Sequence, residues 1–173
     1  IVIRGYRRAD GLFDIEAHLT DTKAYAFENT DRGTIHAGEP LHGMWVRLTV
    51  GEDMAIRQCE AASDHTPFAI CPQAAPNFAA LAGVSIGPGF NRAVKERVGG
   101  VLGCTHLREV LAQMATVAFQ TIGPVRWRKA REEREAAIAR GENPPPHVRP
   151  IPLNSCFAYA EGSEVVKRLQ AGG

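Results

Sequence analysis

The chain has 173 residues, of which 45% are hydrophobic and 23% are charged, and its formal net charge is +1. These values are ordinary for a globular protein that buries its own core, and we expect a single domain over residues 1–173. The small net charge argues against a general polyanion binder, and no apolar run reaches the roughly 18 residues that a membrane span needs.

Four cysteines, with no C-x-x-C pair among them, are too sparse for a disulfide scaffold. The sequence has no charged segment followed by an apolar run, so it predicts no signal peptide. Both observations favour a reduced, cytoplasmic setting. The first residue, Ile1, lies in strand-like sequence without a preceding Met, so we do not take it as the natural N-terminus.

Apolar and polar residues alternate with a period of two in the first half of the chain, which predicts an antiparallel sheet there. The strand-like segments are residues 1–8, 12–25, 44–50 and 54–62, and we expect them to form a meander. The dipeptide Asp10-Gly11 predicts the turn between the first two. Residues 29–39 are rich in polar side chains and are expected to form a loop.

The second predicted strand has a polar face that carries Asp14, Glu16 and His18, and these side chains either face water or line a pocket. His42 precedes the third strand and has the parity of that strand's apolar residues. From this position it could reach a pocket beside the core.

Helical periodicity begins after the sheet. Short helices are expected at residues 72–81 and 90–98, followed by a long amphipathic helix that has its first apolar residue at Leu107 and Thr105 as its N-cap.

The remainder of the chain is charged and then rich in proline. Residues 126–140 carry many Arg and Glu side chains, which favours a solvated helical extension, with nucleic-acid binding as the alternative because Trp127 lies in the basic run. Residues 141–152 contain five prolines and predict an extended connector to a C-terminal tail.

A glycine-rich turn presents Cys104 and His106 where the long helix begins. A helix N-terminus favours an anion, so the pKa of a thiol there falls and a thiolate becomes available. Three chemistries stay open: a metal centre, a nucleophilic cysteine, and proton transfer at a histidine or carboxylate. The residues available as metal ligands are His18, His42, Cys104 and His106.

Six motifs carry a resemblance to a known family: RGYRR (4–8), DGLFDIEAHL (10–19), DTK (21–23), GEPLH (38–42), GCTHL (103–107) and NSC (154–156). Through them the chain resembles a bacterial family known only as a domain of unknown function. The resemblance covers nearly the whole chain. It implies no activity and supplies no catalytic residues.

In its order of elements the chain also resembles iron–sulfur cluster scaffold and sulfur-acceptor proteins, in which a loop cysteine and a His-Cys pair at the last long helix hold the cluster. The resemblance implies that Cys71 and Cys104 occupy these places. The chain departs from that pattern, because a second early loop cysteine is absent and the histidine follows Cys104 by two residues. The resemblance therefore bears on the fold more than on cluster assembly.

We therefore expect an α+β protein, in which an antiparallel sheet of about four strands in the N-terminal half packs against helices in the C-terminal half. The favoured function is an enzyme of the lyase, isomerase or hydrolase type. It would act on a small aromatic or carboxylate-bearing molecule, by metal-assisted or histidine acid/base chemistry. The expected catalytic residues are Glu16, His18, His42, Cys104 and His106, and the expected substrate-binding residues are Arg4, Tyr6 and Lys23.

If the reaction is metal-assisted, the expected cofactor is a zinc or iron ion. If it uses histidine acid/base chemistry, no cofactor is expected. The first alternative is an accessory protein that binds a metal or iron–sulfur cluster or transfers sulfur. The second is a regulatory or nucleic-acid-binding module that uses residues 126–140. No membrane partner is expected, and a homo-oligomer is compatible with the sequence.

Overall fold

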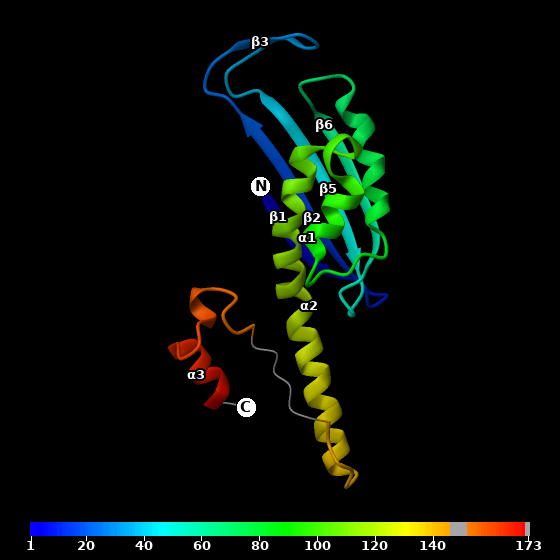
Figure 1. Cartoon of the computed structure of the whole chain (residues 1–173), viewed down its shortest axis with the longest axis vertical. Coiled ribbons are helices and arrows are strands. Elements are labelled where there is room, and N and C mark those ends of the chain that lie inside the picture. The colour runs from blue at the N-terminus through cyan, green and yellow to red at the C-terminus, as the bar shows by residue number, and fades with distance from the viewer. Residues whose placement is uncertain (146–151, 172–173) are drawn as a thin grey trace. The chain divides into compact units, whose positions relative to one another are not determined.

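The computed structural model describes residues 1–145 and 152–171. The chain divides into two compact units, the first ending at Pro124 and the second beginning at Val125. The elements in chain order are β1 (Val2–Arg7), β2 (Phe13–Thr22), β3 (Phe27–Asn29), β4 (Gly33–Ile35), β5 (Pro40–Val50), β6 (Ile56–His65), the 3-10 helix η1 (Cys71–Leu81), α1 (Phe90–Val98), the 3-10 helix η2 (Gly100–Leu102), α2 (Thr105–Ala139), the 3-10 helix η3 (Phe157–Tyr159) and α3 (Glu164–Ala171) (Figure 1).

A four-stranded antiparallel sheet in the order β1-β2-β5-β6 forms the centre of the first unit. The expected α+β class, with the sheet in the N-terminal half and helices after it, is confirmed. The turn between β1 and β2 contains Asp10-Gly11, as expected. Gly11 has a φ of 85°, a left-handed conformation that glycine adopts without steric cost.

A short hairpin at residues 27–35 overlaps the segment expected to be a polar loop, residues 29–39. β3 pairs with β4 from Phe27↔Ile35 to Asn29↔Gly33, and Ile35 is buried. Strands of three residues are too short for alternation to reveal them. β5 also begins at Pro40, earlier than the expected residue 44, so His42 lies within a strand and pairs with Asp21 of β2.

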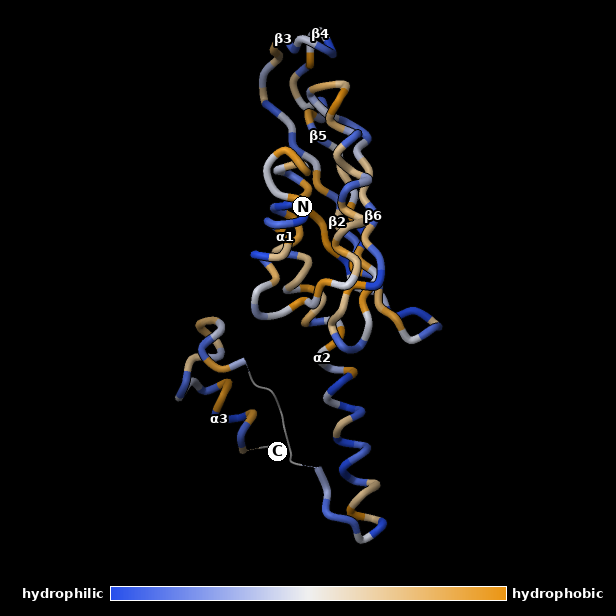
Figure 2. Tube along the Cα trace, turned by 45° about the vertical axis from the view of Figure 1, so that its right-hand side comes forward, coloured by the Kyte–Doolittle hydropathy of each residue, from blue (hydrophilic) through white to orange (hydrophobic). Residues whose placement is uncertain are grey.

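One face of the sheet, here called the inner face, packs against helices and forms the core. The first half of α2 crosses this face (Figure 1). Figure 2 shows hydrophobic residues gathered along the strands of this unit, whereas the second half of α2 is largely hydrophilic. The buried side chains of this core include Phe13, Ile15, Ala17 and Leu19 of β2; Met44, Val46, Leu48 and Val50 of β5; and Leu107, Val110, Leu111, Met114, Ala118 and Ile122 of α2.

Helix α2 also approaches β1 closely at a glycine. A Cβ atom placed on Gly5 would overlap the Thr121 hydroxyl group and lie 2.9 Å from its methyl carbon. Only a residue without a side chain permits this approach of strand and helix.

The first predicted helix differs in type from the expectation. Residues 71–81 form the 3-10 helix η1 with Pro76 inside it, and this helix packs against β6. The ring of a proline clashes with the carbonyl four residues earlier in an α-helix, which disfavours a regular α-helix around Pro76. The second expected helix, at residues 90–98, is α1.

The long helix starts one residue earlier than its expected cap implies. The carbonyl of Cys104 accepts a hydrogen bond from the N–H of Arg108 at 3.0 Å, so Cys104, rather than Thr105, holds the N-cap position. The expected extension at 126–140 is helical to Ala139. Of the expected connector at 141–152, residues 146–151 lie outside the described residues. No helix in the described part of the chain combines the length and apolarity of a membrane span.

Candidate functional site

Three ionisable side chains lie together at one end of the inner face of the sheet. Asp21 lies two residues after Leu19, and His42 lies two residues before Met44, so both continue the core-facing side of their strands. The pairing of β2 with β5 places Asp21 opposite His42. His106 comes from the first turn of α2 and precedes the buried Leu107. Three separate elements therefore meet at this cluster.

Asp21 holds His42 by two different groups. The His42 main-chain N–H donates to Oδ1 of Asp21 at 2.7 Å, and the ring Nδ1 lies 3.0 Å from each carboxylate oxygen. An ionised carboxylate only accepts hydrogen bonds, so Nδ1 carries the proton in a neutral His42 and Nε2 keeps its lone pair. The side chain of His42 is 8% exposed and that of Asp21 is 44% exposed.

His106 lies against His42. Their ring centroids are 3.7 Å apart and their planes differ by 30°. Burial lowers the pKa of His106, and neighbouring His42 lowers it further, while Asp21 acts in the opposite direction. The imidazole of His106 is therefore neutral at neutral pH.

Asp21 remains ionised in this setting. Burial by itself would raise the pKa of its carboxyl group, but the hydrogen bonds from the ring and main chain of His42 outweigh burial, and the pKa falls below its ordinary value. The cluster thus combines one carboxylate with two imidazoles.

These three residues have the composition of a metal site. Each offers one ligand atom, and the three atoms all lie within 4.8 Å of one another. In residues 1–145 and 152–171, no other group of three or more His, Cys, Asp or Glu side chains comes as close together. Two histidines and one carboxylate are a recurring ligand set for iron and zinc.

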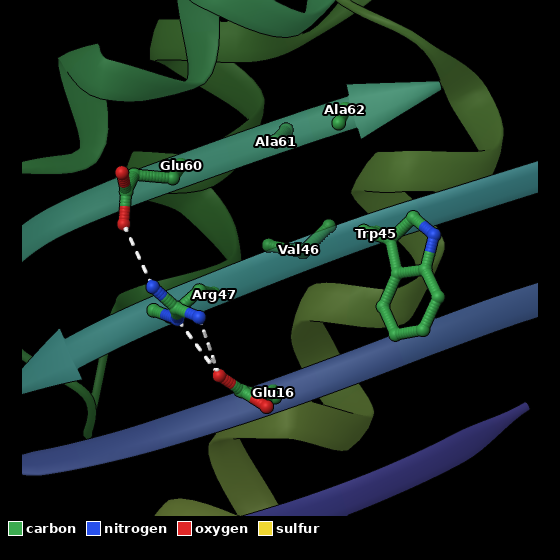
Figure 3. A pocket seen from close by; sticks show the side chains of 7 residues that line it. All are labelled: Glu16, Trp45, Val46, Arg47, Glu60, Ala61 and Ala62. Carbon is green, nitrogen blue, oxygen red and sulfur yellow. Dashed lines mark hydrogen bonds and ion pairs between the residues drawn. The ribbon is translucent and has the colours of Figure 1, made fainter. Parts of the chain in front are cut away.

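Two of the expected catalytic residues lie on the opposite, outer face of the sheet. Glu16 and His18 alternate along β2 with the core residues, so they point away from the cluster. His18 stacks on Trp45 with ring centroids 3.8 Å apart and planes 8° apart. Arg47 lies between Glu16, at 2.8 Å, and Glu60, at 3.6 Å (Figure 3).

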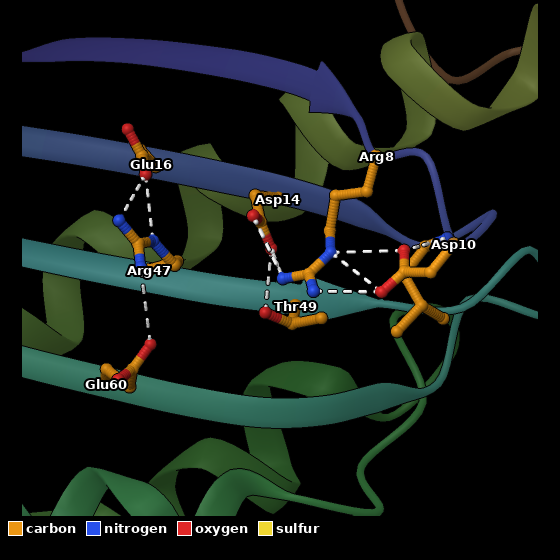
Figure 4. A network of polar contacts seen from close by, with 8 residues as sticks. Arg8, Asp10, Asp14, Glu16, Arg47, Thr49 and Glu60 are labelled. Carbon is orange, nitrogen blue, oxygen red and sulfur yellow. Dashed lines mark hydrogen bonds and ion pairs between the residues drawn. The ribbon is translucent and has the colours of Figure 1, made fainter.

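The outer face carries a shallow hollow and a network of ion pairs. The hollow has a volume of about 370 Å³ and lies beside Trp45 and Arg47 (Figure 3). Along the same face Arg8 contacts both Asp10 and Asp14 (Figure 4). These charges pair with one another at the surface, which is the usual arrangement for a solvated strand face.

The remaining expected site residues are also placed. Cys104 is half-buried at the N-cap of α2 and does not belong to the three-residue cluster. Arg4 and Tyr6 pair with Glu16 and Asp14 across β1 and β2, so they lie on the outer face, where both are exposed. The ammonium of Lys23 lies 3.7 Å from the ring centroid of Phe27, in a cation–π contact.

Of the expected catalytic set, the structure thus brings His42 and His106 together and adds Asp21. A signal for Asp21 is present in the sequence, because its parity along β2 is that of Phe13, Ile15 and Leu19. A carboxylate that continues an apolar strand face is unusual, because positions of that parity along the strand are otherwise occupied by core residues.

The family described as a protein of unknown function, DUF2889, matches residues 1–120, and the chain belongs to this family. The match includes all three residues of the cluster. No curated protein and no solved structure matches the chain.

Proposed function

We propose that this DUF2889 member is an enzyme of the lyase, isomerase or hydrolase type, which acts on a small organic molecule at the cluster of Asp21, His42 and His106. One observation carries the proposal: three ionisable side chains from β2, β5 and α2 converge at the end of an otherwise apolar face. Buried ionisable groups cost folding free energy unless they are paired, and clusters of them are concentrated at functional sites.

The pairing of Asp21 with His42 supplies an acid/base group. The carboxylate fixes the ring through Nδ1, so that Nε2 is the atom that can take a proton from a substrate and return it. The negative charge of Asp21 stabilises the imidazolium formed in between. His106, stacked on His42 and neutral, offers a second imidazole beside the reacting group.

The test is a screen with matched variants. Wild-type protein is incubated with a panel of small esters, hydroxy acids and phenolic ketones, and products are detected by mass spectrometry. Any turnover should fall by about 100-fold or more in His42→Gln and Asp21→Asn, because general acid–base catalysis typically contributes a rate enhancement of at least that size. His18→Gln and Glu16→Gln, which change the same residue types on the outer face, should keep it. Turnover that survives both inner-face variants would contradict the proposal.

A second candidate is an accessory protein that binds a metal ion without catalysing a reaction. The closeness of the three donor atoms, within 4.8 Å, favours it. It predicts metal binding together with no turnover on any member of the panel.

A further inference from the structure

We infer that the cluster binds one divalent metal ion of the zinc or ferrous iron class, with Asp21, His42 and His106 as its three protein ligands. The inference rests on the proposed function for its site and adds the cofactor that this site uses. The ligand set differs from the one expected from sequence, because Asp21 takes the place of His18 and Cys104.

The spacing of the donors suits an ion. Nδ1 of His42 and the Asp21 oxygens are 3.0 Å apart. If an ion lay about 2.1 Å from both donors, they would enclose an angle of about 90° at it, as neighbouring ligands of a six-coordinate ferrous ion do. A bound ion would take the place of the Nδ1 proton, which would then reside on Nε2, so the ring would stay neutral.

The charge of the cluster also calls for a cation. Asp21 contributes one negative charge, and its only ion-pair partner in the described part of the chain is His42, with no Lys or Arg within 4.0 Å. One carboxylate and two neutral imidazoles are the protonation states that bind a divalent metal.

The fold holds the ligands before any ion arrives. Asp21 and His42 are paired across adjacent strands, and the main-chain N–H of His42 fixes one Asp21 oxygen at 2.7 Å. His106 is fixed by the first turn of α2, next to buried Leu107. A preorganised donor set loses little conformational entropy when it binds a metal.

Three protein ligands leave coordination positions for water and substrate. Metal-bound water has a pKa near 7 in zinc enzymes, so it supplies the base at neutral pH. With an ion bound, Nε2 of His42 would carry the displaced proton and would no longer act as the base described for the metal-free cluster. A water on the ion would supply that base, and the three side chains would hold the ion.

The experiment titrates the whole chain, stripped with a chelator, with Co²⁺ alone under anaerobic conditions. Visible absorption and calorimetry should show one Co²⁺ per chain, displaced by Zn²⁺. Asp21→Asn, His42→Gln and His106→Gln should each weaken binding by at least about tenfold. Glu16→Gln and His18→Gln should bind as the wild type does. Absence of Co²⁺ and Zn²⁺ binding by the wild type, or equal binding by the three inner-face variants, would overturn the inference.

Two spectroscopic measurements identify the ligands directly, and the first of them needs no variant. Proton NMR of the Co²⁺-loaded wild type should show two strongly shifted, exchangeable imidazole N–H signals, and their absence would contradict the two-histidine set. A sulfur-to-cobalt charge-transfer band that disappears in Cys104→Ser would likewise overturn the ligand set. Circular dichroism of each variant identifies any loss of binding that comes from unfolding.

The two proposals can fail separately. A wild type that binds no metal, but loses turnover in His42→Gln, overturns the metal inference and leaves the proposed function standing. A wild type that binds Co²⁺ through the three ligands, with turnover unaffected by their substitution, supports the metal inference and overturns the proposed function.

Discussion

Asp21 and His42 face each other across β2 and β5 and are joined through both the main chain and the side chain of the histidine. The carboxylate accepts the His42 N–H at 2.7 Å and lies 3.0 Å from its ring Nδ1. A single carboxylate thus continues the pairing of the two strands and also orients the imidazole. This double contact fixes the orientation of the ring relative to the two strands.

The first prediction concerns the stability that this contact provides. Asp21→Ala leaves the His42 N–H and Nδ1–H without an acceptor, and we expect the free energy of unfolding to fall by about 1–3 kcal/mol. Asp21→Asn keeps one acceptor oxygen and should lose less. Urea unfolding measures both, with Glu16→Ala on the outer face as control, where an exposed ion pair is worth at most about 1 kcal/mol. Equal losses for Asp21→Ala and Glu16→Ala would contradict this role.

The second prediction concerns the approach of β1 to α2. A methyl group in Gly5→Ala overlaps the Thr121 side chain, so we expect a loss of about 1–3 kcal/mol in the free energy of unfolding. Thr121→Ala removes the hydroxyl and methyl groups that overlap, so the double variant should recover most of that loss. Gly87→Ala, which meets nothing within 4 Å, is the control and should change stability by less than about 0.5 kcal/mol. The measurement is a double-mutant cycle by urea unfolding, and additive losses would exclude the steric explanation.

Much of the first unit follows from local patterns in the sequence. The alternation in residues 13–19 determines which face of β2 is buried, and the spacing of Leu107, Val110, Leu111 and Met114 determines the buried side of α2. The hairpin of β3 and β4 escapes such reasoning because its strands are shorter than one recognisable period.

Predicting the cluster from the sequence would have required knowing how residues far apart in the chain pair with one another. His42 and His106 stand out by residue type, but the pairing of Asp21 with His42 joins residues 21 positions apart and depends on where β5 begins. The sequence predicted that start at residue 44, and it placed Glu16 and His18 in one site with His42, Cys104 and His106. Strand register is a tertiary property, which one sequence without its partners leaves open.

The third prediction separates the outer-face charges from the core. Arg47 contacts Glu16 and Glu60, and all three side chains are substantially exposed (Figure 4). Exposed pairs are screened by salt, so Arg47→Ala should lower the free energy of unfolding by less than about 1 kcal/mol at low salt. The difference between wild type and variant should shrink further in 1 M sodium chloride, where the screening length is about 3 Å. A loss that does not change with salt would indicate packing by the arginine stem instead.

The fourth prediction concerns thiol reactivity. Burial, with a smaller contribution from Glu60, raises the pKa of Cys59 to about 12, and the residue is 3% exposed. Cys71 and Cys104 are partly exposed and Cys156 is exposed. Because the thiolate is the reactive form, iodoacetamide at pH 8 should modify these three and leave Cys59 intact until urea unfolds the protein. Peptide mass spectrometry identifies the sites, and modification of Cys59 in the folded protein at a similar rate would contradict its burial.

The fifth prediction follows from the same pKa and concerns stability against pH. The thiol of an unfolded chain loses its proton near its ordinary pKa of 9.0, whereas folded Cys59 keeps its proton up to about pH 12. Between these values the folded state binds more protons than the unfolded state, so stability falls as the pH rises. The contribution is fully present below pH 9 and lost as the pH approaches 12. Other groups titrate in this range too, so the measurement compares wild type with Cys59→Ala by urea unfolding from pH 8 to 11. The wild type should lose stability more steeply, and parallel curves would show that Cys59 ionises as freely in the folded protein as in the unfolded chain.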